Sequence, residues 1–118
     1  MEEFFLHFIW KYKKFNQEDL CTTSGVQVVV IHPGFDHTSA GPDFRMARLR
    51  IDGLEWAGSV EIHVKSSDWY QHGHQNDINY DKVILHVVWT HDRPVVDSCG
   101  NAIPTIELKG RIRRSVFD

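Results

Sequence analysis

The sequence lacks the features that mark several common classes of protein. Its two cysteines, Cys21 and Cys99, are too few for a disulfide scaffold, so we expect a reducing compartment, the cytoplasm. No apolar run approaches the roughly 20 residues of a membrane-spanning helix, and we therefore expect no membrane partner. Acidic residues outnumber basic residues by 16 to 13, so contact with nucleic acid would require a local basic patch.

Several catalytic motifs are missing as well. The chain has no glycine-rich phosphate loop, no dinucleotide-binding glycine fingerprint and no nucleophile elbow built around a serine. These absences exclude the commonest nucleotide-binding and serine-hydrolase signatures. Histidine, by contrast, is abundant, with eight residues among 118.

The hydrophobic pattern predicts one small α+β domain over residues 1–118. Apolar residues repeat at helical spacing over residues 2–15, so we expect an N-terminal helix packed on a mixed or antiparallel sheet. Its apolar face is expected to consist of Phe5, Phe8, Ile9, Tyr12 and Phe15. Asp52-Gly53 is a preferred sequence for a two-residue hairpin turn. Strands are expected over residues 26–31, 44–51, 54–65, 82–90, 95–96 and 102–108, with a short helix within 68–82.

The strand expected over residues 54–65 carries ionisable side chains on one face. Because side chains alternate along a strand, Glu61, His63 and Lys65 face the same side. This pattern is typical either of a solvated strand face or of a functional site. A second acid, Asp43, stands beside the start of the facing strand, which favours a site.

Register decides whether these acids meet. A two-residue turn would place Asp43 opposite Ile62, on the wrong face from Glu61. A bulge near Ala57-Gly58 would shift the pairing by one residue and bring Asp43 opposite His63, and glycine within a strand often marks a bulge. We therefore expect a bulge at this point, or a twist at the end of the strand.

Two converging carboxylates suit Mg²⁺ or Mn²⁺. Asp43 and Glu61 would bind the ion, with water and a phosphate oxygen as its further ligands. Such an ion polarises a phosphoryl oxygen and lowers the pKa of bound water. His63 and Lys65 would position that water or stabilise developing charge. These four residues are the candidate catalytic group.

A second polar cluster follows the strand. His72, His74 and Asp77 would contact substrate, or would bind Zn²⁺, because imidazole and carboxylate are ligands of transition metals. Surface or turn roles are the plain alternative, since Gly73 would splay the two rings. Arg45 belongs to a local basic run and is a further candidate for contact with phosphate. Alternatively, this run is simply the solvated face of a strand.

The pattern Pro42-Asp43 followed by Glu61-x-His63 resembles the signature of PD-(D/E)XK nucleases. In that family the two acids bind metal and a lysine follows the second acid by two positions. Here His63 occupies that position, and Lys65 lies two residues further along the same face. The order helix, strand, hairpin, helix, strand also resembles that family's core. The resemblance implies a restriction-endonuclease-like fold and metal-dependent nuclease activity.

Longer segments resemble the N-terminal part of a bacterial domain-of-unknown-function family. The segments that carry this resemblance are Glu3-Phe4 with Ile9-Trp10, and residues 41–44, 56–69, 72–77, 80–88 and 103–108. The resemblance implies a longer protein, in which this chain is an N-terminal fragment. A missing C-terminal region would then be a partner of this domain.

Three functional hypotheses follow. The first is a metal-dependent, nuclease-like hydrolase of phosphodiester bonds in nucleic acid. The second is a non-catalytic interaction module, either an inactive nuclease-like relic or a docking domain for the missing C-terminal region. The third is a transition-metal site for another hydrolysis, built from His63, His72, His74 and Asp77, which convergent imidazoles would favour.

Overall fold

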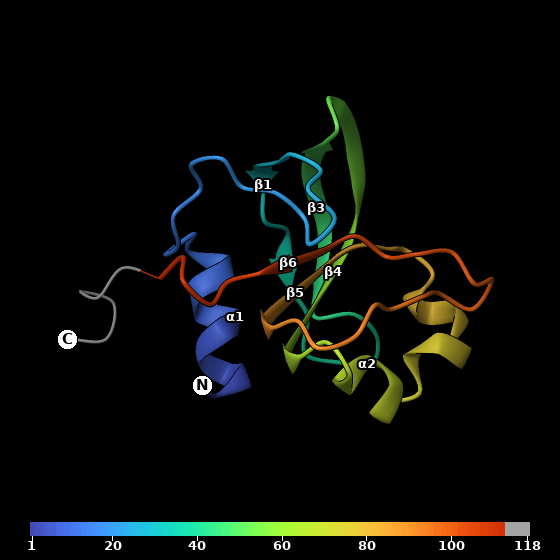
Figure 1. Ribbon diagram of the computed structural model, residues 1–118. Coiled ribbons are helices and arrows are strands. Elements are labelled where there is room, and N and C mark those ends of the chain that lie inside the picture. The colour runs from blue at the N-terminus through green and yellow to red at the C-terminus, as the bar shows by residue number, and fades with distance from the viewer. Residues whose placement is uncertain (113–118) are drawn as a thin grey trace.

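A long β-hairpin forms the centre of the computed structural model, which describes residues 1–112 (Figure 1). Its strands are β3 (Phe44–Ile51) and β4 (Leu54–Lys65), with the bounds that the sequence predicts. At the turn, Asp52 and Gly53 have φ angles of 52° and 80°. A type I′ turn requires positive φ at both central residues, so the predicted hairpin is confirmed.

The hairpin is extended on both sides into a mixed sheet. The strands that flank it are β1 (Val28–His32), β2 (Phe35–Asp36), β5 (Val83–Thr90) and β6 (Thr105–Glu107). The order along the sheet is β1-β3-β4-β5-β6, with β2 also paired to β3. Pairing is antiparallel from β1 to β4 and parallel from β4 to β6. The strand expected at 95–96 is only a single bridge between Val96 and Ala102.

The crossover between β4 and β5 lies on one face of the sheet. Parallel neighbours need such a connection, because the chain must return to the same end of the sheet. Its helical elements are α2 (Asp68–Gln71) and the 3₁₀ turns η1 (His74–Asn76) and η2 (Ile78–Tyr80). Figure 1 shows this crossover and α1 (Glu3–Lys11) at different sides of the strands. The predicted α+β class with a mixed sheet is confirmed.

The buried face of α1 differs from the predicted one. Leu6, Ile9 and Trp10 are buried against the sheet, whereas Phe8 and Tyr12 are exposed. The indole N–H of Trp10 donates to the Pro33 carbonyl oxygen over 2.9 Å, which fixes this rotation of the helix. The prediction holds for Ile9 and Phe15, which are in the core. It was wrong for Phe8 and Tyr12, because aromatic residues stand on both sides of the helix and spacing alone did not identify its buried side.

The bulge that shifts the hairpin register lies on β3, not near Ala57-Gly58 as expected. Phe44 pairs with Val60 and Ala47 pairs with Gly58, so β3 contains one residue more than β4 between these pairs. Met46, within the bulge, has a φ of 61°. Continued by one residue, this register places Asp43 opposite Glu61 rather than opposite His63.

Both faces of β4 are covered over residues 59–63. Val60 and Ile62 pack with α1 in the main core, while Trp69 of α2 and Tyr80 of η2 belong to a smaller cluster on the other face. Glu61 and His63 point toward this second face and are only 4% and 1% exposed. The solvated-face interpretation is therefore wrong for these two residues.

Two further observations concern the surface. Cys21 and Cys99 are exposed and unpaired. Within residues 1–112, no helix is long and apolar enough to cross a membrane.

Candidate functional site

Two hydrogen bonds exchanged between Asp43 and residues 61–62 hold Asp43 beside Glu61. The backbone N–H of Asp43 donates to Oε1 of Glu61 over 3.1 Å. The backbone N–H of Ile62 donates to Oδ2 of Asp43 over 2.9 Å. The bulge in β3 makes this exchange possible, because it aligns Asp43 with Glu61. The two acids expected to converge are thus neighbours.

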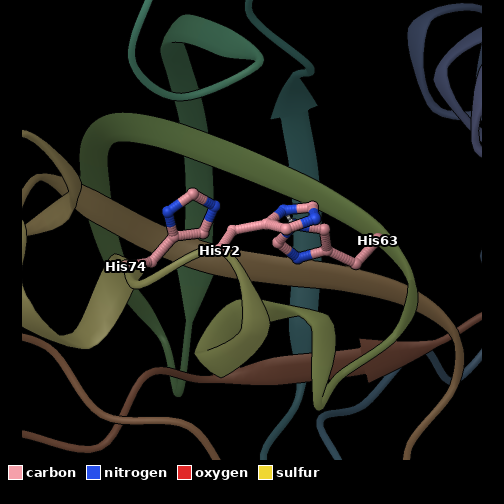
Figure 2. Close-up of side chains that lie close together, drawn as sticks. All are labelled: His63, His72 and His74. Carbon is pink, nitrogen blue, oxygen red and sulfur yellow. Dashed lines mark hydrogen bonds between the residues drawn. The ribbon is translucent and has the colours of Figure 1, made fainter.

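Three imidazole rings converge beside Glu61. Figure 2 shows His63 from β4 together with His72 and His74 from the segment that follows α2. One potential ligand nitrogen of each ring lies within 4.8 Å of the others. His63 Nε2 is 3.2 Å from His72 Nδ1 and 3.4 Å from Glu61 Oε2, and His74 Nε2 is 2.8 Å from the same oxygen. We call these four residues the acid–histidine cluster.

Surrounding rings hold the cluster in place. His63 Nδ1 makes a 2.7 Å hydrogen bond with Nε2 of His86, a fully buried residue of β5. The ring of Tyr80 stacks on His74, with centroids 3.6 Å apart. Trp69 contacts both His74 and His86 edge to face. The crossover therefore supplies the aromatic walls that keep His74 and His86 away from water.

Burial sets the charge of Glu61, His63 and His74. Desolvation and the neighbouring Asp43 carboxylate raise the pKa of Glu61 far above its usual range. Desolvation and adjacent imidazoles lower the pKa of His63 to about 2, that of His74 to about 4 and that of His86 to about 3. At neutral pH these imidazoles are therefore uncharged, which is the form that binds a metal ion.

Unsatisfied nitrogen atoms mark the same place. Among the residues that the structure describes, both ring nitrogens of His74 and Nδ1 of His86 are buried without a hydrogen-bond partner. The 2.8 Å contact between His74 and Glu61 lacks the alignment of a hydrogen bond. Buried polar atoms normally have partners. Three imidazoles and a carboxylate fit a first-row transition metal, and such an ion would provide the missing partner for His74.

A second group of ligand-type atoms adjoins Asp43. Glu3 and His7 of α1 approach it so closely that their potential ligand atoms and that of Asp43 lie within 4.8 Å of one another. His7 Nε2 is 3.6 Å from Asp43 Oδ2. Burial and the Asp43 charge raise the pKa of Glu3. The sequence analysis missed Glu3 and His7, although their spacing of four residues places them on one side of a helix.

The remaining predicted site residues lie around the cluster. Lys65 is at the exposed end of β4, and its backbone N–H donates to the Asp68 carboxylate over 3.2 Å. Asp77 accepts a hydrogen bond from the backbone N–H of Asn79 over 2.9 Å and so caps η2. Arg45 is exposed on the bulge, with one guanidinium nitrogen 3.5 Å from the Ala40 carbonyl oxygen. Asp77 belongs to neither ligand-type group of the described residues.

The fold and the site together define a small α+β domain in which an acid–histidine cluster lies between the mixed sheet and the crossover. The chain belongs to the family described as "Protein of unknown function (DUF2851)", whose model matches residues 3–118. The resemblance to a domain-of-unknown-function family is therefore confirmed. No curated protein and no solved structure matches the chain.

Proposed function

We propose that this domain is a metal-dependent, nuclease-like hydrolase of phosphodiester bonds in nucleic acid. The observation that carries the proposal is the convergence of three imidazoles beside the carboxyl group of Glu61, in a place where His74 lacks a hydrogen-bond partner. A purely structural cluster of this kind would bury unsatisfied polar atoms at a cost of roughly 1–3 kcal/mol each.

The donor set favours Zn²⁺ or Mn²⁺ over Mg²⁺. His63, His72 and His74 offer nitrogen ligands, which Mg²⁺ rarely accepts, while Glu61 offers oxygen. Such an ion supplies a polarised phosphoryl oxygen and a bound water of lowered pKa. Mg²⁺ stays a candidate for the oxygen atoms of Asp43 and Glu61 alone.

The residues of the chain have distinct roles in this proposal. His86 orients His63 through its ring hydrogen bond. Asp43 holds Glu61 through its backbone N–H and presents its own carboxylate beside it. Lys65 would contact a phosphate from the exposed end of β4. Support for a phosphodiester substrate comes from the Pro42-Asp43 and Glu61-x-His63 pattern, which resembles that of PD-(D/E)XK nucleases.

Cleavage assays with matched variants test the proposal. The chain is treated with a chelator and then supplied with Zn²⁺, Mn²⁺ or Mg²⁺ in the presence of duplex DNA, nicked DNA, single-stranded DNA or RNA. We expect cleavage with Zn²⁺ or Mn²⁺. Glu61→Gln and His72→Ala should lower the rate by at least about 100-fold, the upper end of the loss caused by residues that only orient metal ligands.

His32→Gln is the matched control, because His32 lies on β1 and is absent from both ligand-type groups. Its cleavage rate should equal that of the unaltered chain. Cleavage that persists in chelator, or that survives both cluster variants, would overturn the proposal. Metal binding without cleavage of any substrate would favour the alternative, a non-catalytic interaction module, either an inactive relic or a docking domain.

A further inference from the structure

A groove of about 830 Å³ lies between the hairpin and the crossover. One wall consists of the loop at residues 40–42 together with Arg45 and Met46 of the bulge. The other wall contains Ile78 of η2 and Lys82, which precedes β5. Small residues at positions 57–59 of β4 form part of its floor. The groove is therefore built from the segments that also carry the candidate site.

Backbone geometry at Met46 and Gly58 shapes this groove. The bulge turns Met46 outward, so that its side chain is 71% exposed. At Gly58, an added Cβ would lie 2.6 Å from Cγ2 of Ile84 and 2.9 Å from the Lys82 carbonyl oxygen. Only glycine therefore lets the start of β5 approach β4 so closely. A larger residue at this position would push the start of β5 away from β4.

Two segments that line the groove continue along the chain into the paired carboxylates. Ser59 lines it and lies two residues before Glu61 on β4, so both side chains point to the same face of the sheet. Pro42 lines the opposite wall and immediately precedes Asp43. A chain bound along the groove would therefore be directed to the paired carboxylates.

The lining combines flat or apolar surface with positive charge. Trp56 is 50% exposed and Ile78 is 75% exposed. Within residues 1–112, neither Arg45 nor Lys82 makes an ion pair with a carboxylate. Asp81, the acid of the lining, accepts hydrogen bonds from the backbone N–H and the hydroxyl of Ser98. The cations are thus available to an anionic ligand.

We propose that this groove binds a single strand of nucleic acid, with a base stacked on Trp56 and neighbouring phosphates paired with Arg45 and Lys82. Aromatic side chains beside cations are the usual platform for single strands, since every base has a flat face. A duplex keeps its bases stacked inside and cannot offer one to Trp56. The inference deepens the proposed function by naming its substrate class, but binding itself requires neither metal nor cleavage.

Binding is measured in EDTA by fluorescence anisotropy, using a labelled oligothymidylate, a labelled oligouridylate and a duplex of equal length. We expect one or both single strands to bind more tightly than the duplex. Trp56→Ala should weaken this binding about 10-fold, within the range known for loss of one stacking platform. Trp56→Phe should retain most of it. The control Leu54→Ala removes an exposed apolar side chain on the same strand but outside the groove.

Salt dependence tests the two cations. Replacing Arg45 and Lys82 together by glutamine should reduce the slope of log K against log salt by about 1.4, or 0.7 for each lost phosphate contact. Arg50→Gln, which removes an exposed charge outside the groove, should leave the slope unchanged. Circular dichroism confirms that each variant is folded.

The outcomes separate this inference from the proposed function. Single-strand binding that depends on Trp56, without cleavage in any metal, supports the groove and counts against the hydrolase. Cleavage that stays unchanged when Trp56, Arg45 and Lys82 are replaced supports the hydrolase and overturns the proposal of single-strand binding in the groove. Equal binding of duplex and single strands, or no binding of either single strand, also overturns it.

Discussion

Nδ1 of His63 lies 2.7 Å from Nε2 of His86, and both rings are almost fully buried. One nitrogen donates and the other accepts, so this bond fixes the plane of the His63 ring. The opposite nitrogen of His63 is thereby directed toward His72 and Glu61. His86, which is not a candidate ligand, thus determines where the candidate ligand His63 points.

This relationship predicts that His86 is a positioning residue for metal binding. His86→Phe keeps an aromatic ring beside Trp69 but removes the hydrogen bond to His63. Affinity for Zn²⁺, measured by calorimetry, should fall about 10–100-fold, as for other residues that orient metal-binding histidines. His86→Gln should restore part of the affinity, because an amide can again pair with His63. Loss of thermal stability with unchanged Zn²⁺ affinity in His86→Phe would reduce His86 to a packing role.

A second prediction concerns Glu61, whose burial beside the Asp43 carboxylate costs stability. Glu61→Gln keeps an oxygen for the Asp43 backbone N–H and removes the ionisable group. In EDTA the variant should have a free energy of unfolding about 1 kcal/mol higher than the unaltered chain, a gain typical of relieving strain at a functional site. Urea denaturation measures the difference.

Adding Zn²⁺ should reverse this order. A ligand that binds only the folded chain stabilises it by about 2.7 kcal/mol at 100 times its dissociation constant. The unaltered chain should gain this stability, while Glu61→Gln should gain little. Equal gains in both proteins would show that Glu61 does not hold the ion.

The elements predicted correctly are those that local sequence determines. Asp52-Gly53 and the alternation on either side of it define the hairpin without reference to any distant residue. The bulge is different, because Met46 carries no local signal for positive φ, whereas Gly58 does resemble a bulge marker. Gly58 instead allows β5 to approach, which is a tertiary effect. The contact of His7 with Asp43 likewise depends on how α1 packs against the sheet, so it could not be predicted from sequence spacing alone.

A third prediction tests the strain at Met46. A residue other than glycine in the left-handed region costs roughly 1–2 kcal/mol. Met46→Gly should therefore raise the free energy of unfolding by about 1 kcal/mol, and Met46→Val should lower it by a similar amount. Arg45→Gly is the matched control, because Arg45 lacks positive φ. Arg45→Gly should lower the free energy of unfolding by about 0.5–1 kcal/mol. If Met46→Gly also lowered it, Met46 would not be strained.

The fourth prediction is a pH dependence that arises away from the cluster, at Asp92. Its carboxylate accepts hydrogen bonds from the Ser67 hydroxyl at 2.7 Å, the Ser67 backbone N–H at 2.9 Å and the Ser66 hydroxyl at 2.9 Å. These bonds, that of the Ser67 hydroxyl above all, lower the pKa of Asp92 to about 2. They join the end of β5 to the start of α2, whose N-cap Ser67 makes no side-chain cap bond within its own helix.

Because the folded chain lowers this pKa, it holds the ionised form of Asp92 more strongly than the unfolded chain does. The resulting stability is complete above the ordinary aspartate pKa of about 3.9 and is lost as the pH falls toward about 2. Asp92→Asn should therefore melt at a lower temperature than the unaltered chain at pH 7, and the difference should shrink steadily between pH values of about 4 and 2. Ser67→Ala should reproduce part of this profile, since it removes the shortest of the three bonds. A melting difference that stays constant across this pH range would mean that Asp92 acts through packing and not through its charge.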